Sequence, residues 1–182
     1  MTGVRRAIHS LATMGVLLTA TAGLATAQDR PATELSAGYT YLRDIRTDVD
    51  FSKGWMVEGS RRLGPAWAVV QFDRSIAALP LVIGDASVSV RAIMAGARVA
   101  GHIGRFREFL QLLAGDVRGR GVLFGNESAE SRFAIQPGIG LDVPLMRTFG
   151  ARLQFDDRLM RGNRRWTQVE LRLLAAVVYS FD

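Results

Sequence analysis

Apolar and polar positions alternate with a period of two along the end of the chain. In residues 166–181, one parity is apolar from Val169 onward, whereas the other parity carries Glu170 and Arg172. A period of two predicts a β-strand with two unlike faces. No amphipathic helix elsewhere in the sequence can cover the apolar face, so lipid is the economical cover. This pattern favours a closed barrel whose polar face points inward.

The same alternation predicts seven further strands. Their ranges are residues 34–43, 54–63, 66–75, 88–100, 106–117, 132–143 and 149–158, and the eighth strand takes 166–182. The alternation blurs near Arg98, where the pattern allows a bulge. Pro137 is awkward within a paired strand because it cannot donate to the ladder.

The predicted connections alternate between long and short. Long loops are expected at residues 44–53, 76–87, 118–131 and 159–165, and short turns at 64–65, 101–105 and 144–148. Outer-membrane barrels have short periplasmic turns, longer outer loops and an even number of strands. The predicted fold class is therefore all-β, an eight-stranded antiparallel up-and-down transmembrane β-barrel that follows a cleaved signal peptide.

The first 27 residues have the composition of a secretory signal peptide. Arg5 and Arg6 form a charged start, a short apolar stretch follows, and Ala25–Ala27 is a small-x-small cleavage site. After residue 27 no charge-free run exceeds ten residues, whereas a membrane-spanning helix needs about 20 apolar residues. We therefore predict a signal peptide at residues 1–27 and one barrel domain at residues 28–182.

The overall charge and the absence of cysteine limit the classes of partner. The chain of 182 residues has a formal net charge of +6 and no cysteine. This mildly basic balance suits contact with anionic surfaces but does not demand nucleic acid. An exported chain without cysteine takes its stability from sources other than disulfides. We expect a monomer in contact with outer-membrane lipid, with no nucleic-acid partner.

The whole pattern is similar to that of the small eight-stranded outer-membrane barrels, the family of the transmembrane domain of outer membrane protein A. The resemblance covers residues 34–181 and rests on the export signal, the strand count, the alternation of loops and the ending V-V-Y-S-F. It implies a location in the cell outer membrane, and it makes Tyr179 and Phe181 the signal read by the outer-membrane assembly machinery. The family usually ends on the aromatic residue, whereas here Asp182 follows Phe181.

Strand parity assigns polar side chains of both signs to the barrel interior. They are Glu34, Glu58, Arg62, Gln71, Asp73, Arg91, Gln111, Gln136, Asp142, Arg152, Gln154, Asp156, Glu170 and Arg172. An eight-stranded barrel is just wide enough for side chains to fill it, and buried charges must pair. We therefore predict an interior ion-pair network that plugs the lumen. A narrow gated pore along the same charges is the alternative.

Five arginines fall in the predicted outer loops. A guanidinium group matches the geometry of phosphate, so these residues are candidates for contact with lipopolysaccharide. The alternative is plain solvated loop charge. The five residues are Arg118, Arg120, Arg161, Arg164 and Arg165.

Aromatic residues gather toward the predicted strand ends. Two aromatic girdles at the membrane interfaces would give this distribution. Ordinary core aromatics of a soluble sheet are the alternative. The residues are Tyr39, Tyr41, Trp55, Trp67, Phe149, Trp166, Tyr179 and Phe181.

The sequence assigns no catalytic, cofactor-binding or metal-ligating residue. His102 is the only histidine after residue 27, and it lies in a predicted periplasmic turn with no acid or serine at a suggestive spacing. We therefore predict an integral outer-membrane protein with a structural or surface-interaction role, and not an enzyme. Three alternatives stay open: a soluble periplasmic lipocalin-like barrel that binds an apolar ligand, a lipid A-modifying outer-membrane enzyme, and a narrow pore.

Overall fold

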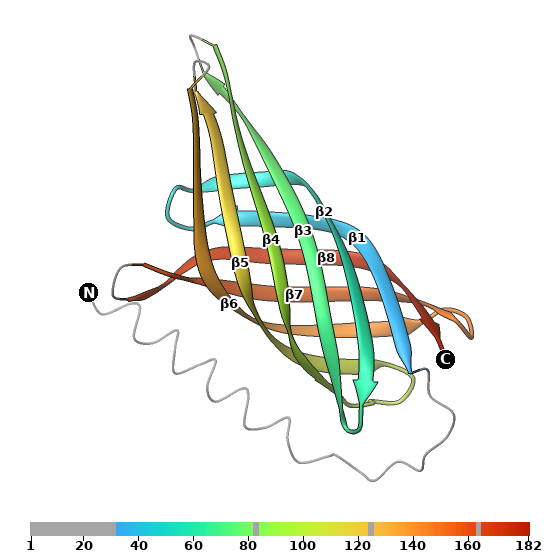
Figure 1. The fold of residues 1–182 in the computed structure, drawn as a ribbon. Helices are drawn as coiled ribbons and strands as arrows, with labels where there is room; N and C mark the ends of the chain where they lie inside the picture. Colours follow the sequence, from blue (N-terminus) through green and yellow to red (C-terminus); the bar gives the residue numbers. More distant parts are fainter. Residues whose placement is uncertain (1–31, 82–83, 124–125, 163–164) are drawn as a thin grey trace, which may run out of the picture. The chain divides into compact units, whose positions relative to one another are not determined.

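Eight antiparallel strands close into a barrel in their order along the chain (Figure 1). A computed structural model describes residues 32–81, 84–123, 126–162 and 165–182. The strands are β1 (Thr33–Asp44), β2 (Val49–Leu63), β3 (Ala66–Leu81), β4 (Gly84–Ala100), β5 (Arg107–Leu123), β6 (Asn126–Pro144), β7 (Phe149–Arg161) and β8 (Trp166–Phe181). No helix in this part of the chain is long and apolar enough to cross a membrane.

The barrel is closed by the pairing of the first strand with the last. β1 and β8 run antiparallel, from Thr33 opposite Phe181 to Asp44 opposite Glu170, without a register shift. Closure leaves no free sheet edge, so every strand has a hydrogen-bonded neighbour on both sides. This is the condition under which a β-structure can span lipid. The predicted fold class is confirmed, whereas the predicted signal peptide lies outside the described residues.

The strands extend further than predicted at one end of the barrel. β2 begins at Val49, β3 runs to Leu81, β5 runs to Leu123 and β6 begins at Asn126, where the sequence predicted loops. The central residues of three predicted loops, 82–83, 124–125 and 163–164, lie outside the described residues. Figure 1 shows the β3–β4 and β5–β6 hairpins projecting from the ring of strands. The outer face of a hairpin that extends beyond the lipid needs no apolar side chains, so its sequence needs no period-two pattern.

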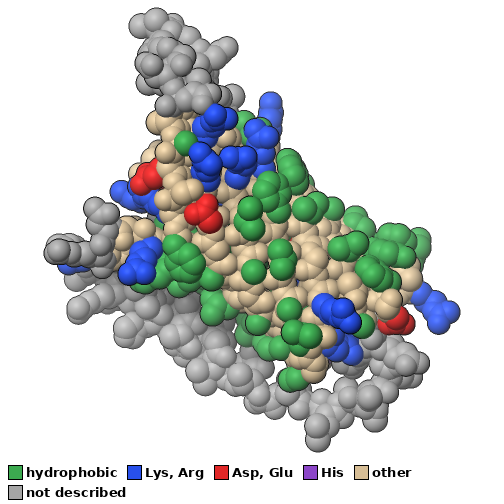
Figure 2. Space-filling model, viewed as in Figure 1, with side chains coloured by type: hydrophobic (Ala, Val, Ile, Leu, Met, Phe, Trp, Pro, Cys, Tyr) green, Lys and Arg blue, Asp and Glu red, His purple; other side chains and the backbone are tan. Residues whose placement is uncertain are grey.

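The outer faces of the strands carry the apolar parity and the inner faces carry the polar parity. On β8, Leu173 and Val177 are more than half exposed, whereas Arg172, which precedes Leu173 and lies on the opposite face, is fully buried. Figure 2 shows hydrophobic side chains spread over the outer wall. This arrangement is the reverse of a soluble barrel and matches a wall surrounded by lipid.

Aromatic pairs lie on the outer wall toward both ends of the barrel. Toward the projecting hairpins, Trp55 lies with its ring 5.3 Å from that of Phe72, and Phe133 lies 6.0 Å from Trp166. At the other end, the ring of Tyr179 lies 5.0 Å from that of Phe149 and 5.5 Å from that of Phe181. These positions agree with two interfacial girdles. Trp67 does not, because its side chain is buried inside the barrel.

Pro137 is accommodated on the side of β6 that faces β7. The β6–β7 register pairs Ile135 with Leu159 and resumes at Gly138 with Asp156, so two positions are unpaired and the register is unchanged. The ladder to β5 continues through Pro137. Proline has no N–H donor, so it can lose a ladder hydrogen bond to one neighbouring strand only. Here the interrupted ladder is the one to β7. The β4 ladders pass Arg98 without a register shift, so there is no bulge there.

Candidate functional site

A network of charged side chains fills the lumen toward the periplasmic end. This is the end at which β1 begins and β8 ends. Arg152 is its centre, with Nε 2.7 Å from Oδ1 of Asp142 and Nη1 2.6 Å from Oε1 of Glu58. Arg98 donates to the same Glu58 oxygen at 2.6 Å. Arg107 joins Asp142 to Glu34 through ion pairs of 2.5 Å each. All but Arg107 of these side chains are buried, so each guanidinium takes a carboxylate in place of water.

A second group of charges fills the lumen toward the projecting hairpins. Arg158 donates to Asp73 at 2.8 Å and to Glu170 at 3.0 Å, and Arg172 donates to Asp156 at 2.5 Å. All five side chains are buried, and both guanidiniums reach the same oxygen of Asp73. One carboxylate thus holds β7 and β8 against β3 across the barrel. The two ion pairs of Asp73 therefore link strands that are not neighbours in the sheet.

Glutamine side chains connect the two groups of charges. Gln111 accepts a hydrogen bond from Arg98 at 2.8 Å and donates to Asp156 at 3.2 Å. Gln71 accepts from Arg172 at 2.9 Å, and Gln136 accepts from Arg158 at 2.8 Å. The lumen is therefore one continuous polar network, with amides between the ion pairs.

An aromatic ring is built into this network. Phe109 is buried in the lumen, and the guanidinium carbons of Arg98 and Arg152 lie 4.4 Å and 4.8 Å from its ring centroid. Gly140 makes the room, because a Cβ at that position would collide with the ring. The ring gives the two cations a weakly polar face at a point where a further carboxylate would add an unpaired negative charge.

The structure brings most of the predicted interior residues together. Gln154 joins the network by donating to Asp156 at 2.9 Å. The buried members are Glu34, Glu58, Gln71, Asp73, Gln111, Gln136, Asp142, Arg152, Gln154, Asp156, Glu170 and Arg172. Arg62 lies half-buried at the periplasmic rim, with its guanidinium 5.2 Å from the ring centroid of Trp67. It stacks on an aromatic ring and takes no part in the ion pairs that the described residues form in the lumen.

The prediction for Arg91 is wrong. Arg91 is exposed on the outer wall, and Val90, Ala92 and Met94 fill the inner face of β4. The inner wall is apolar at this height, because Val117 of β5 and Phe51 of β2 belong to the same buried cluster. The prediction assigned the polar parity of each strand to the interior. In this part of β4 the opposite holds, because the inner face is apolar and the outer face carries the charge.

Three arginines of the network escaped the sequence analysis. Arg158 shares the parity of Asp156 and lies two residues beyond it, and Arg107 shares the parity of Gln111. Both residues lie within the predicted strands 106–117 and 149–158, so the same alternation identifies them. Arg98 has the parity opposite to that of Arg91, and the prediction took the parity of Arg91 as the inner face, so no signal in that strand identified Arg98.

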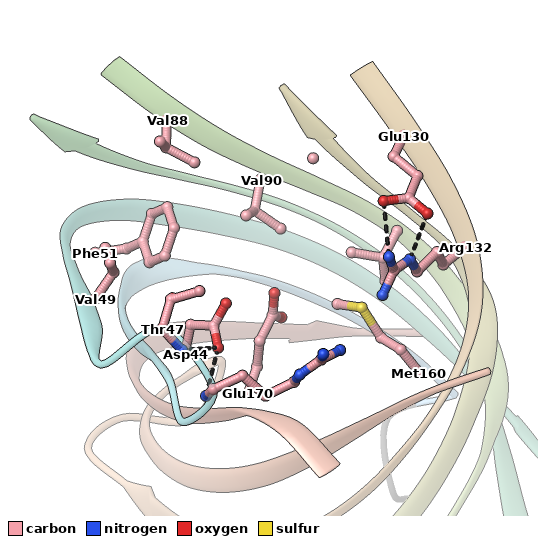
Figure 3. A pocket seen from close by; sticks show the side chains of 13 residues that line it. Asp44, Thr47, Val49, Phe51, Val88, Val90, Glu130, Arg132, Met160 and Glu170 are labelled. Atoms are coloured by element: carbon pink, nitrogen blue, oxygen red, sulfur yellow. Dashed lines mark hydrogen bonds and ion pairs between the residues drawn. The ribbon is translucent and has the colours of Figure 1, made fainter. Parts of the chain in front are cut away.

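The lumen opens into an apolar cup at the end that carries the projecting hairpins (Figure 3). In barrels of this type that end is extracellular. The extracellular cup has a volume of about 620 Å³, and its wall includes Phe51, Val90 and Met160. Glu170 lies at its base, and the pair Glu130–Arg132, at 2.7 Å, lies on one side. The polar network thus ends below a hollow with apolar walls and a charged rim.

The described arginines among those predicted for lipopolysaccharide lie around the extracellular end, although three of them belong to strands and not to loops. Arg118 and Arg120 lie on β5, exposed on the outer wall. Arg161 is the last residue of β7, and Arg165 precedes β8; both are exposed. Arg164 lies outside the described residues. The ladder continues through 118 and 120, so β5 places these side chains on a wall where a loop was expected.

His102 lies at the opposite end of the barrel. It is exposed in the connection between β4 and β5, and it lines a hollow of about 390 Å³ together with Arg105 and Arg147. This placement agrees with the predicted periplasmic turn. No group of three His, Cys, Asp or Glu side chains among the described residues is arranged to hold a metal ion.

Solved structures with this fold are outer-membrane barrels. Neisserial surface protein A matches with a TM-score of 0.66 at 12% identity, over 82% of this chain and 96% of that chain. Ail, the attachment invasion locus protein of Yersinia pestis, matches with a TM-score of 0.58 at 12% identity, over 84% and 100%; it has also been solved in complex with the heparin analogue sucrose octasulfate. The N-terminal barrel domain of Pseudomonas aeruginosa OprF matches with a TM-score of 0.54 at 13% identity, over 85% and 100%.

The sequence itself matches no protein-family model and no curated protein. The structural likeness therefore defines the class by fold, as a small eight-stranded barrel of the outer-membrane type. The resemblance to the transmembrane domain of outer membrane protein A agrees with this class. The outward apolar wall agrees with the predicted location in the outer membrane.

Proposed function

We propose that the protein is an integral outer-membrane barrel with a sealed lumen, and that its role is structural or interactive rather than catalytic. The observation that carries this proposal is the network around Arg152, Arg158 and Arg172. Each of these guanidiniums is buried and bound to carboxylates from other strands. An ion on its way through the barrel would have to displace these pairs, and breaking a buried pair costs about 3–5 kcal/mol.

Ion conductance tests the sealed lumen. The mature protein is reconstituted into planar lipid bilayers, with a large porin in the same bilayers as the positive control. We expect no stepwise conductance from the wild-type protein in 1 M KCl. The Debye length at this ionic strength is about 3 Å, but salt screens buried ion pairs much less than exposed ones, so the pairs of the lumen stay intact. Reproducible unitary steps from the wild-type protein would replace the sealed barrel with the narrow pore.

The extracellular end is the proposed interaction surface. It presents the extracellular cup and the exposed side chains of Arg118, Arg161 and Arg165. We propose lipopolysaccharide as the anionic partner of this end, because guanidinium groups bind phosphate through charge-assisted hydrogen bonds. Ail, which shares the fold, forms a complex with a sulfated heparin analogue. We propose that the barrel acts as a monomer in the outer membrane.

The final strand is the proposed signal for the assembly machinery. Tyr179 is exposed on the outer wall, between the rings of Phe149 and Phe181. In the unassembled chain these aromatics end an apolar face that a partner could read. Replacing Phe181 by Ala is expected to lower the amount of assembled barrel in the outer membrane, whereas Ser180→Ala on the same segment is expected to leave it unchanged.

A further inference from the structure

Three arginines of the outer wall lie side by side on neighbouring strands. The register pairs Arg74 of β3 with Arg91 of β4, and Arg91 with Arg118 of β5. All three side chains are exposed. Neighbouring strands are about 4.8 Å apart, so the three Cα atoms span about 10 Å. We call these three residues the arginine row.

The arginine row lies directly beyond the apolar wall. Two residues closer to the periplasm on each strand, the outward positions are Phe72 on β3, Ile93 on β4 and Asp116 on β5. The register continues sideways from the row to Trp55 on β2, and Trp55 packs on Phe72. An aromatic pair of this kind marks the level of lipid head groups. The row therefore lies at the outer interface, within reach of phosphates and not of acyl chains.

The arginine row is electrostatically unfavourable by itself. Like charges directly opposite one another on adjacent strands destabilise a sheet. Within the part of the chain that the structure describes, none of the three guanidiniums has an ion-pair partner. Asp116 is the acid nearest along β5, and it accepts a hydrogen bond from Ser131 at 3.1 Å. An anion shared by the three guanidiniums would relieve the repulsion.

The surface around the arginine row supports a lipid as the source of that anion. Figure 2 shows basic side chains gathered next to the hydrophobic wall, toward the β3–β4 and β5–β6 hairpins. A ligand that binds here would touch guanidiniums at one end and apolar side chains such as Ile93 and Val70 at the other, both more than half exposed. This combination is complementary to a phosphorylated amphiphile whose acyl chains run along the wall.

We propose that the arginine row is a binding site for the phosphate groups of a phosphorylated glycolipid of the outer leaflet. Arg74 and Arg91 add a wall site to the lipopolysaccharide contact proposed above, and Arg118 is shared by both. This inference rests on the proposed location in the outer membrane, because only a lipid-embedded wall presents the row to head groups. The three guanidiniums offer several donors in fork geometry to one phosphate.

The test compares two triple variants with equal loss of charge. One carries Arg74→Gln, Arg91→Gln and Arg118→Gln. The control carries Arg61→Gln, Arg105→Gln and Arg147→Gln, which are exposed at the periplasmic half of the barrel. Both proteins are first shown to be folded by their gel mobility without boiling. Failure at that step in the wild-type protein would count against the membrane barrel, whereas failure at the next step counts against the arginine row alone.

Binding is measured in non-ionic detergent with lipid A, with lipid A from which the phosphates have been removed, and with inorganic pyrophosphate. We expect the row variant to bind lipid A at least about tenfold more weakly than the wild type, and the control variant to stay within about twofold. The affinity of the wild type is expected to fall when the phosphates are removed, and also as salt rises. A triple Arg→Lys variant keeps the charge but loses the fork geometry. We expect it to bind lipid A more tightly than the Gln variant and more weakly than the wild type, because charge and geometry both contribute.

Four results would overturn the proposal. The row variant and the wild type could bind lipid A equally, or the control variant could lose as much affinity as the row variant. Dephosphorylated lipid A could bind as tightly as lipid A. Pyrophosphate bound as tightly as lipid A would show a site for a free anion, and would exclude the lipid as the specific occupant.

Discussion

At the scale of single residues, the lumen is held together by a few guanidiniums that each serve several strands. Arg152 contacts three carboxylates, those of Glu34, Glu58 and Asp142. A buried ion pair is not in itself better than apolar packing. Removing one partner from such a pair is nevertheless destabilising. A carboxylate left alone in the lumen has lost its hydration without gaining a cation.

Replacing Arg152 by Met is therefore expected to destabilise the barrel strongly. It leaves buried carboxylates without their shared cation, so the free energy of unfolding should fall by about 3–5 kcal/mol. Urea unfolding in lipid vesicles, followed by tryptophan fluorescence, measures the change. The control is Arg147→Met, an exposed residue between β6 and β7, which should change the free energy by less than about 0.5 kcal/mol. Equal effects of the two variants would contradict a structural role for the network.

A second residue-scale prediction concerns the room left for Phe109. A Cβ at Gly140 would collide with the Phe109 ring, whereas a Cβ at Gly119 meets nothing within 4 Å. We expect Gly140→Ala to lower the free energy of unfolding by about 1–3 kcal/mol because the ring must move. Gly119→Ala is expected to be neutral or slightly stabilising. A neutral Gly140→Ala, in the same vesicle unfolding experiment, would show that the ring is not fixed by the network.

At the scale of the strands, the apolar parity of the terminal strand decides what surrounds the barrel. Leu173 is 54% exposed on the outer face of β8, so its environment is either lipid or water. In lipid, Leu173→Arg should lower the free energy of unfolding by about 2 kcal/mol or more, since an outward charge near the bilayer centre costs about 2–4 kcal/mol. Met146→Arg, in the exposed turn between β6 and β7, is the matched control and should be nearly neutral.

The same pair of variants separates the membrane barrel from the soluble one. In a soluble barrel, water would surround Leu173, and Arg at an exposed position would change stability by less than about 0.5 kcal/mol. A neutral Leu173→Arg variant with folded protein in the soluble fraction would thus favour the lipocalin-like alternative. Failure of the variant to appear in the outer membrane, with normal assembly of Met146→Arg, would support the lipid-facing assignment.

The strands also show where sequence pattern is informative. Period-two alternation located all eight strands because each strand separates the lumen from an apolar exterior, and its successive side chains point alternately to the two sides. It stopped short at Ser75, Val117 and Arg132, which lie inside continuous strands of the structure. Beyond the bilayer the outer face of a hairpin needs no apolar side chains, and the pattern that identifies a strand is lost there. The resulting error placed Arg118 in a loop.

Strand four shows the corresponding limit for the site. Its inner face is apolar because it lines the extracellular cup, and its outer face carries Arg91 at the membrane interface. Parity alone cannot tell an inward arginine from an outward one when both faces are otherwise apolar. The pairing of Arg91 with Arg74 and Arg118 is a property of the register. It became visible only when the three strands were aligned.

At the scale of the whole molecule, two features lie inside the barrel and one lies on its outer wall. The ion-pair network fills the lumen, the extracellular cup lies beyond it, and the arginine row lies on the outer wall at the level of the cup. The network and the arginine row are independent features, since one faces inward and the other outward. Loss of the arginine row should thus leave the barrel closed, and loosening of the lumen should leave lipid binding intact.

The measurement that tests the central claim most directly is the gel mobility of the mature protein from washed outer membranes, with and without boiling in detergent. A closed barrel whose backbone bonds are all internal resists detergent until it is heated. We expect a band in the outer-membrane fraction that changes mobility on boiling. A band found in the soluble periplasmic fraction, with the same mobility before and after boiling, would contradict the lipid-embedded barrel.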